Sequence, residues 1–344
     1  MRALRFYPRE RNLCIEDVEV REPRGDEVLV RVVGAGLCGS DLHIVDGEFE
    51  DFVREPVTLG HEVAGVVDSI GPDVRELGLG ESVAVMVGWG CGRCEWCVGG
   101  HEQLCPTGHQ AGATCDGAFA EFMLVPHRRH VVPLGDLDSL QASPFGCAAL
   151  SAFAAVSRVT PHVSAGQTVA VIGIGGLGEF ALQFLGHLTG ARVVAVDVRE
   201  LARARSLSLG ASQAVEPEHA PDAVDDVSSG RGAGAVIDLV GSSDSLALAA
   251  SVVARRGVVA LLGVGGGTLP FGYWTMAPEA SLTTVLAGSV ADLQNVVRLA
   301  QEGAIASRVQ AYPLDEAQRA IAELRAGSVE GRAVLVPSQI SVRG

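Results

Sequence analysis

The sequence predicts an α/β fold in which a doubly wound domain with a parallel sheet accompanies a β-rich domain. In the first part of the chain, short β-branched runs bounded by glycine, proline or aspartate are typical of strands joined by loops. From about Thr168, apolar runs of strand length alternate with segments whose apolar residues recur at helical spacing. Such alternation is typical of parallel strands connected by helices. At roughly 150 residues per domain, the length of 344 residues agrees with two domains.

The elements follow in order along the chain. Strands of the β-rich part are expected at 28–33, 63–70 and 82–87. In the alternating part, the expected strands are 169–172, 193–196, 235–239 and 258–262, and the expected helices are 177–188, 201–209 and 245–253. The tail is expected to form helices at 291–300 and 314–324 and a strand at 333–336. We therefore expect a nucleotide domain at 151–287, inserted in a catalytic domain that spans 1–150 and returns at 288–344.

The composition excludes several functional classes. With 41 acidic against 26 basic side chains and a formal charge of −15, neither nucleic acid nor an anionic membrane is an expected partner. All basic residues other than histidine are arginines, so mechanisms based on a Schiff-base, phosphate-loop or kinase lysine are excluded. Residues 1–13 carry several charges and no apolar segment, so we expect no secretory signal and a cytoplasmic location.

A glycine-rich turn joins the first strand of the alternating part to its helix. Gly173, Gly175 and Gly178 form the pattern G-x-G-x-x-G, with Gly176 inside the turn. The first glycine allows the tight turn, the second lets the backbone approach a pyrophosphate, and the third allows close packing of helix and strand. The N–H groups and dipole of the helix N-terminus would then bind the phosphates of a dinucleotide.

An acidic residue follows where a dinucleotide site requires one. Asp197 ends the next strand, where its carboxylate can accept hydrogen bonds from the adenosine ribose and would repel a 2′-phosphate. Arg199, two residues later, softens that preference. The alternative is that Asp197 caps the following helix. Together the turn and the carboxylate predict a Rossmann domain that prefers NAD(H) to NADP(H).

Four closely spaced cysteines indicate a structural zinc site. Cys91, Cys94, Cys97 and Cys105 form C-x2-C-x2-C-x7-C. Four thiolates at this spacing can close a tetrahedral site with no open position, which would fasten a small lobe at about 88–106. The alternative is that the four cysteines are separate buried thiols. Disulfides are not expected in a cytosolic chain.

A second set of metal ligands is scattered along the chain. Cys38, His61 and Cys147 would give two thiolates and one imidazole, which leave the fourth zinc position free for substrate. Spacing alone does not select these three residues, and a lone cysteine such as Cys147 is more often a small core residue.

These motifs together resemble the zinc-dependent medium-chain alcohol dehydrogenases. The segment Gly60-His61-Glu62, continued by Gly65, Gly71 and Val74, is similar to the zinc signature of that family, and the four-cysteine lobe and the glycine turn follow in the family's order. The resemblance spans nearly the whole chain. It implies that the β-rich domain is GroES-like and that the enzyme transfers a hydride between an alcohol and NAD.

Site residues are carried over from this resemblance. It implies that Cys38, His61 and Cys147 hold the catalytic zinc, that Glu62 lies beside the metal as a transient ligand, and that Asp41 holds the ligand imidazole through its other nitrogen.

The resemblance also implies a proton relay and a phosphate contact. Ser40 would hydrogen-bond the substrate oxygen and start a proton relay through the nicotinamide ribose to His43 near the surface. Without the family, Ser40 is an ordinary turn serine and His43 a solvated surface histidine. Arg332 is implied as a contact to a cofactor phosphate.

The chain departs from the family at two positions. Gly39 and Ala202 stand where many relatives carry basic residues that contact the cofactor, which affects cofactor affinity rather than chemistry. Cys14 and Cys115 remain outside both ligand sets and are interpreted as packing residues.

The predicted function is that of a zinc-dependent oxidoreductase acting on an alcohol, or the corresponding aldehyde or ketone, with NAD(H) and two zinc ions per chain. A homo-oligomer, either dimer or tetramer, is expected. One alternative is a polyol dehydrogenase of the same family, although these commonly use glutamate where Cys147 stands. The other is a non-catalytic, zinc-stabilised nucleotide sensor, which would have no reason to retain Ser40 and His43. Four aromatic residues form either an apolar substrate pocket or part of the core: Phe49, Phe52, Trp89 and Phe119.

Overall fold

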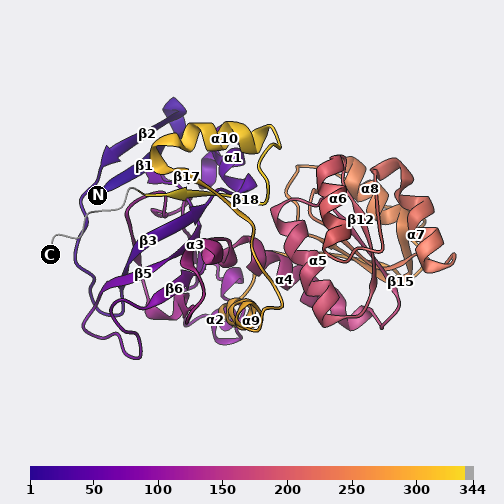
Figure 1. Cartoon of the computed structure of the whole chain (residues 1–344), viewed down its shortest axis with the longest axis horizontal. Helices are drawn as coiled ribbons and strands as arrows, with labels where there is room; N and C mark the ends of the chain where they lie inside the picture. Colours follow the sequence, from indigo (N-terminus) through magenta and orange to yellow (C-terminus); the bar gives the residue numbers. More distant parts are fainter. Residues whose placement is uncertain (338–344) are drawn as a thin grey trace. The chain divides into compact units, whose positions relative to one another are not determined.

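The computed structural model describes residues 1–337, which form two compact units. The first unit is Met1–Leu150 together with the described part of Ser289–Gly344, and the second is Ser151–Gly288. The second unit is therefore inserted in the sequence of the first. Figure 1 shows the C-terminal segment in yellow beside the N-terminal strands in indigo, within one unit.

The first unit is built on a mostly antiparallel seven-stranded sheet. Its strands are β3 (Val28–Gly36), β5 (Glu62–Ile70), β6 (Ser82–Val85), β9 (Phe122–Val125), β10 (Val131–Pro133), β17 (Val309–Pro313) and β18 (Arg332–Val336). The order is β10-β6-β5-β3-β18-β17, with β9 also on β3. Val334 of β18 lies opposite Gly36 of β3, so the C-terminal segment completes the sheet that the N-terminal segment begins.

Smaller elements surround this sheet. A three-stranded sheet has the order β2-β1-β4, and a two-stranded sheet pairs β7 with β8. These strands are β1 (Arg2–Tyr7), β2 (Asn12–Asp17), β4 (Val57–Thr58), β7 (Gly88–Trp89) and β8 (His109–Gln110). The helices are α1 (Gly39–Asp46), α2 (Glu95–Val98), α3 (Ser139–Ala142), α9 (Val290–Gln301) and α10 (Ala317–Arg325). Short 3₁₀ turns of the first unit are η1 (Pro8–Glu10), η2 (Glu50–Phe52), η3 (Glu102–Leu104), η4 (Arg128–His130), η5 (Ser143–Gly146) and η8 (Leu314–Glu316), and those of the second unit are η6 (Thr160–His162) and η7 (Pro217–His219).

The core of the first unit lies between these sheets. Phe6, Leu37, Leu59, Phe119 and Tyr312 are almost fully buried and belong to one hydrophobic cluster. Burying side chains of this size stabilises a domain by about 1.5–3 kcal/mol each. The cluster draws residues from both ends of the chain, so the fold of this unit requires the returning C-terminal segment.

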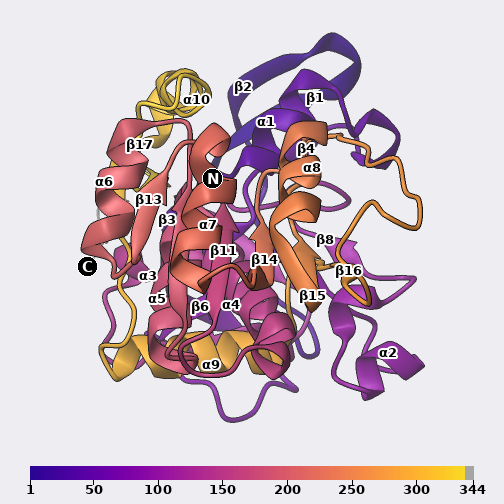
Figure 2. The ribbon, with the colours of Figure 1, turned by 90° about the vertical axis from the view of Figure 1, so that its right-hand side faces the viewer.

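The second unit is a parallel six-stranded sheet. Its strands are β11 (Thr168–Ile172), β12 (Arg192–Val196), β13 (Gln213–Val215), β14 (Ala233–Asp238), β15 (Val253–Leu261) and β16 (Ser281–Thr284). The order β13-β12-β11-β14-β15-β16 reverses direction after β11, as in a doubly wound dinucleotide fold. Its helices are α4 (Ala148–Val159), which spans the junction of the units in sequence, α5 (Gly176–Leu188), α6 (Glu200–Ser208), α7 (Ala220–Ser228) and α8 (Ser243–Val252). Figure 2 shows these strands together with the helices that flank them.

Side-chain contacts place helices on both faces of this sheet. One hydrophobic cluster joins the strands to α7 and α8, through residues such as Val224 and Ala249. Elsewhere α4 packs against α5, where the rings of Phe153 and Phe184 lie edge to face with centroids 5.3 Å apart. Both faces of the strands are therefore buried, which explains their uninterrupted apolar sequences.

The α/β fold class predicted from the sequence is confirmed, with differences in single elements. The segment expected as one helix at 314–324 is the turn η8 followed by α10, and the strand expected at 82–87 ends at Val85. The sequence analysis missed α4, because its apolar residues surround the helix instead of forming one stripe. It also missed β16, whose four residues give too short a pattern to distinguish it from a loop.

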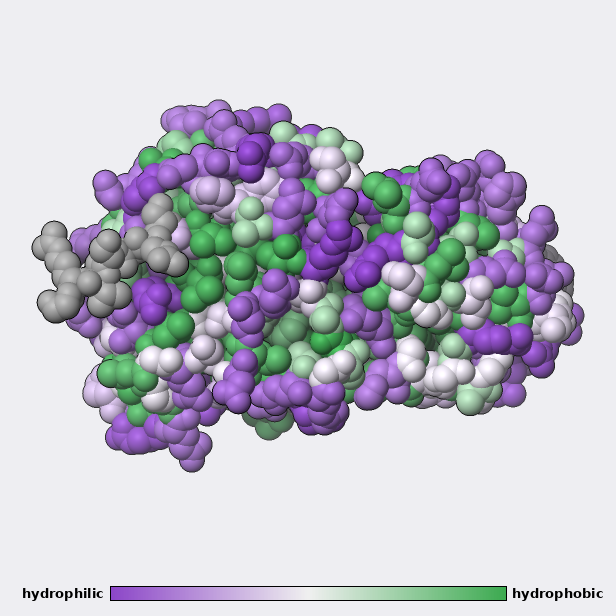
Figure 3. Space-filling model, viewed as in Figure 1, coloured by the Kyte–Doolittle hydropathy of each residue, from purple (hydrophilic) through white to green (hydrophobic). Residues whose placement is uncertain are grey.

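Two observations concern the surface and the helices. On the face drawn in Figure 3, hydrophilic and hydrophobic residues are interspersed. Among residues 1–337, no single helix is long and apolar enough to cross a membrane, and one pair bent by 52°, Ser139–Gly146 with Ala148–His162, meets the length and composition requirements only when both are joined.

Candidate functional site

Four residues from three separate segments of the chain meet in a buried cluster of the first unit. Cys38, His61, Glu62 and Cys147 each offer one ligand atom, and these atoms lie within 4.8 Å of one another. Cys38 follows β3 and caps α1, Glu62 begins β5, and Cys147 follows η5. The adjacent ends of β3 and β5 thus bring the first three together, and the start of α4 supplies the fourth.

Glycines allow the close approach of these segments. A Cβ atom on Gly36 would lie 2.2 Å from Oε2 of Glu62, so any larger residue there would displace the carboxylate. Gly60 has a φ of +94°, and a Cβ atom on it would lie 2.4 Å from the ring of Phe119. Both positions therefore require glycine.

Asp41 orients the histidine of the cluster. Its Oδ2 accepts a hydrogen bond of 2.8 Å from the backbone N–H of Cys38, and its Oδ1 lies 3.5 Å from Nδ1 of His61. Burial alone would lower the pKa of His61, but Asp41 and Cys38 together raise it well above its usual value. Because Asp41 faces Nδ1, the other ring nitrogen, Nε2, is the one directed to a metal.

The donor set fits a zinc ion with one open position. Cys38 and His61 are buried, and Nε2 of His61 and Oε2 of Glu62 have no hydrogen-bond partner within residues 1–337. The contact with Cys147 holds the pKa of Cys38 well below its usual range, whereas the same pairing raises that of Cys147. Two sulfur atoms and one imidazole are ligands that zinc prefers, and three protein ligands leave the fourth position for a substrate.

Arg332, which the resemblance implies as a contact to a cofactor phosphate, lies against Glu62 in the structure. Its side chain is buried, pairs with Oε1 of Glu62, and donates a hydrogen bond of 3.2 Å to the carbonyl oxygen of Leu37. Burial raises the pKa of Glu62 to about 7 against the opposing effect of this guanidinium. Arg332 is therefore the partner of Glu62, because β18 pairs with β3 and carries the residue into the interior of the first unit.

Ser40 and His43 lie one turn apart on α1. The Ser40 hydroxyl is 3.7 Å from Sγ of Cys38, next to the cluster. His43 is partly exposed, and its Nδ1 lies 2.7 Å from Oε2 of Glu48. Residues three apart share a helix face, so α1 leads from the buried cluster toward the surface.

The four-cysteine lobe also gathers its ligands. The Sγ atoms of Cys91, Cys94, Cys97 and Cys105 lie within 4.8 Å of one another. Backbone N–H groups of Cys91 and Cys97 point to sulfur atoms of the set, at 3.3 and 3.5 Å. The helix of this lobe, α2, buries no side chain. Four sulfur ligands without an apolar core fit a structural zinc ion that holds the lobe together.

A separate cavity of about 580 Å³ lies in the second unit, at the carboxyl ends of its strands. The glycine turn lines it: Gly173 has a φ of +92°, and a Cβ atom on Gly178 would lie 2.3 Å from the carbonyl oxygen of Gly173. The turn leads into α5, whose first N–H groups have no partner inside the helix. This arrangement fits the pyrophosphate of a dinucleotide.

The cavity contains residues that the sequence analysis did not single out. They follow β14 and include Leu239, Val240, Ser242, Asp244 and Leu248. The signal that identifies them is topological: ligands of open α/β sheets bind where the strand order reverses, which here is between β11 and β14.

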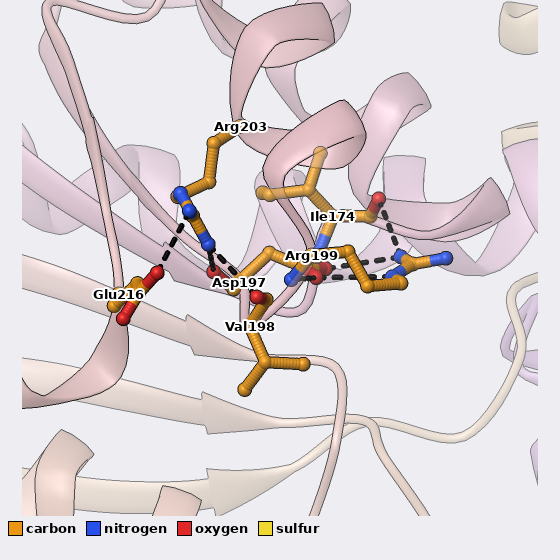
Figure 4. Close-up of polar contacts among 6 residues, drawn as sticks. All are labelled: Ile174, Asp197, Val198, Arg199, Arg203 and Glu216. Atoms are coloured by element: carbon orange, nitrogen blue, oxygen red, sulfur yellow. Dashed lines mark hydrogen bonds and ion pairs between the residues drawn. The ribbon is translucent and has the colours of Figure 1, made fainter.

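Asp197 and Arg199 face each other at the edge of this cavity (Figure 4). The Asp197 carboxylate accepts hydrogen bonds from the backbone N–H of Ile174 at 2.7 Å and of Arg199 at 2.9 Å. The guanidinium of Arg199 binds it through two nitrogen atoms, both at 3.0 Å. Burial opposes ionisation, but these contacts still lower the pKa of Asp197.

Comparisons with known proteins show the family of this chain. Residues 24–136 match the family described as "Alcohol dehydrogenase GroES-like domain", and residues 176–302 match "Zinc-binding dehydrogenase". An "NAD-dependent alcohol dehydrogenase" of Sulfurisphaera tokodaii is 35% identical over 98% of this chain and 100% of the relative. The chain belongs to the zinc-dependent medium-chain alcohol dehydrogenase family. It is an oxidoreductase.

Other relatives of this dehydrogenase show the range of the family. A solved structure of the alcohol dehydrogenase from Aeropyrum pernix superposes with a TM-score of 0.92 at 32% identity, covering 98% of this chain and 100% of the other. A "D-arabinose 1-dehydrogenase (NADP(+))" of Saccharolobus solfataricus is 34% identical over 94% of both chains. Relatives of similar identity thus differ in the substrate and cofactor that their names give.

We expect Cys94→Ser to unfold the four-cysteine lobe of this dehydrogenase locally and to lower its thermal stability. The substitution removes a sulfur ligand, and α2 has no buried side chain to hold the lobe once the metal is lost. Metal analysis should show the loss of about one zinc per chain, and calorimetry should show a Tm several degrees lower. An unchanged metal content would contradict the assignment of Cys94 as a ligand.

Proposed function

We propose that this dehydrogenase transfers a hydride between an alcohol, or the corresponding aldehyde or ketone, and NAD(H). The buried set of Cys38, His61 and Cys147, with an open position beside Ser40, carries the proposal. A non-catalytic nucleotide sensor would not need a metal site with a free coordination position. The names of the similar proteins support the same conclusion, as does the cavity that the glycine turn lines in the second unit.

Each residue of the proposed sites has its own role in the reaction. When bound, zinc acts as a Lewis acid on the substrate oxygen, and the nicotinamide accepts or donates the hydride. Ser40 accepts the hydroxyl proton of the alcohol while it releases its own proton toward His43, and the partly exposed His43 passes a proton to solvent. Asp41 keeps His61 in one tautomer and orientation. Asp197 binds the adenosine ribose and the glycine turn binds the pyrophosphate.

We propose two zinc ions per chain, because the two ligand sets share no residue. The test combines metal analysis with NADH formation from primary and secondary alcohols, polyols and aldoses. We expect two zinc ions and turnover of simple alcohols. An active protein with one zinc or none would contradict the metal assignment, and zinc-loaded protein without turnover on any substrate would favour the nucleotide sensor.

The panel includes polyols and aldoses because one relative bears the name of a D-arabinose dehydrogenase. Turnover of polyols alone would favour the polyol dehydrogenase alternative. Trp89 and Phe119 are buried and Phe49 packs against the same core, so these aromatic side chains mainly support the fold and give little guidance on substrate size.

We propose that two copies pair through β16, which forms the edge of the parallel sheet. The strand carries no charge or proline that would block pairing. The loop before it exposes three aromatic residues, Phe271, Tyr273 and Trp274. Exposed aromatic clusters mark interaction sites, and the same patch on both subunits gives a closed dimer. A tetramer would require a second surface.

The proposed compartment is the reducing cytoplasm. All eight cysteines are free, and six of them belong to the two proposed metal sites, which require reduced thiols.

A further inference from the structure

The carboxylate proposed to bind the ribose is already fully occupied by the protein. A carboxylate has about four lone-pair positions for hydrogen bonds. Oδ1 of Asp197 accepts from the backbone N–H and the Nε of Arg199, and Oδ2 accepts from the backbone N–H of Ile174 and from the second guanidinium nitrogen of Arg199. A ribose hydroxyl can therefore donate to Asp197 only if one of these donors leaves.

The guanidinium of Arg199 is the donor that can leave. The two backbone N–H groups belong to the glycine turn and to the start of α6, and moving them would deform the fold. The Arg199 side chain is 42% exposed, whereas Asp197 is 6% exposed. Its terminal nitrogen also donates 3.1 Å to the carbonyl oxygen of Ile174, so the guanidinium closes over the glycine turn (Figure 4).

The neighbouring arginine does not share this role. Arg203 donates to the carbonyl oxygens of Asp197 and Val198, at 3.0 and 2.8 Å, and pairs with Glu216 at 2.8 Å. Figure 4 shows it on the other side of the turn, directed to Glu216. The charge of Arg203 is thus matched by Glu216, and within residues 1–337 the charged partner of the Asp197 carboxylate is Arg199.

We propose that Arg199 is an internal competitor of the adenosine ribose for Asp197, and that it sets the cofactor preference. When NAD(H) binds, ribose hydroxyls replace the bidentate guanidinium at the Asp197 carboxylate. Loss of the ion pair therefore offsets part of the binding free energy that the hydroxyls contribute. A 2′-phosphate would instead bind the released guanidinium, because this group matches phosphate geometry. Arg199 therefore weakens NAD(H) binding and retains affinity for 2′-phosphorylated dinucleotides. This inference rests on the proposed function of the second unit.

The test compares 5′-AMP with 2′-deoxy-5′-AMP, which carry the same charge and differ by one ribose hydroxyl. Isothermal titration calorimetry on the zinc-loaded protein gives the ratio of their Kd values. We expect the lost hydroxyl to weaken binding about twofold in the unmodified enzyme and about tenfold in Arg199→Met, where the carboxylate is open to the ribose. Binding of 2′,5′-ADP should weaken about tenfold in the same variant.

Arg205→Met is the matched control. Arg205 lies on α6, the helix that Arg199 precedes as its N-cap residue, and it pairs with Glu179 instead of Asp197. Its replacement by methionine removes the same charge. We expect this control to keep the wild-type ratio. An equal ratio in all three proteins would overturn the inference, as would an equal increase in both variants. If the unmodified enzyme binds NADH while the ratio stays constant, only this inference fails; if it binds neither NADH nor 5′-AMP, the proposed function fails with it.

Discussion

Cys38→Ser should lower kcat/KM by roughly three orders of magnitude, because the catalytic site loses a metal that supplies several kcal/mol of transition-state stabilisation. A neutral hydroxyl is a poor substitute for a thiolate as a zinc ligand. The fold should survive, since serine can still cap α1: Cys38 begins this helix as a capping residue, and serine is a preferred residue there. Metal analysis should show about one zinc per chain, with a Tm close to that of the unmodified enzyme.

Two comparisons make this prediction specific. Cys94→Ser should lose the other zinc and mainly stability, so the two variants separate the catalytic from the structural site. Cys14→Ser is the neutral control, because Cys14 lies on β2, outside both clusters. If Cys38→Ser lost one zinc and kept wild-type turnover, the buried cluster would not be the catalytic centre.

The fold could be predicted from local patterns where those patterns are regular. The strands and helices around the glycine turn are long, periodic and bounded by breakers, and the doubly wound class follows from their alternation. Elements whose identity depends on tertiary context could not be predicted in the same way. Helix α4 is apolar on all sides because it is buried. Strand β17 pairs with β18, but its short sequence pattern did not predict a strand.

The metal sites differ in how far the sequence determines them. Cys91 and Cys94 belong to a short motif whose spacing alone indicates a site, whereas Cys38 and Cys147 are brought together only by the fold. Their assignment came from family resemblance. The contact of Arg332 with Glu62 was not predicted, because it joins β18 to β5 across the sheet, and the ion pair of Arg199 with Asp197 depends on a side-chain conformation that no sequence pattern specifies.

Ser40→Ala should slow the chemical step by roughly 100-fold or more, while zinc content and NADH affinity stay within about twofold of the unmodified enzyme. The Ser40 hydroxyl lies 3.7 Å from Sγ of Cys38, close enough to the open metal position to reach a substrate oxygen there. Without it, the proton of the alcohol has no acceptor placed beside the reacting group. Single-turnover measurement of NADH formation isolates this step from product release.

His43→Gln should have a smaller effect, and that difference separates a relay from a general loss of structure. His43 is partly exposed and contacts Glu48, so a base from the buffer can take over its role, whereas none can reach the position of the inner hydroxyl. We therefore expect added imidazole to restore most of the rate of His43→Gln and none of that of Ser40→Ala. Ser40→Thr, which keeps the hydroxyl, should retain most of the activity. Near-normal single-turnover rates in Ser40→Ala would instead mean that the proton leaves by another route, with Glu62 in the same cluster as the next residue to examine.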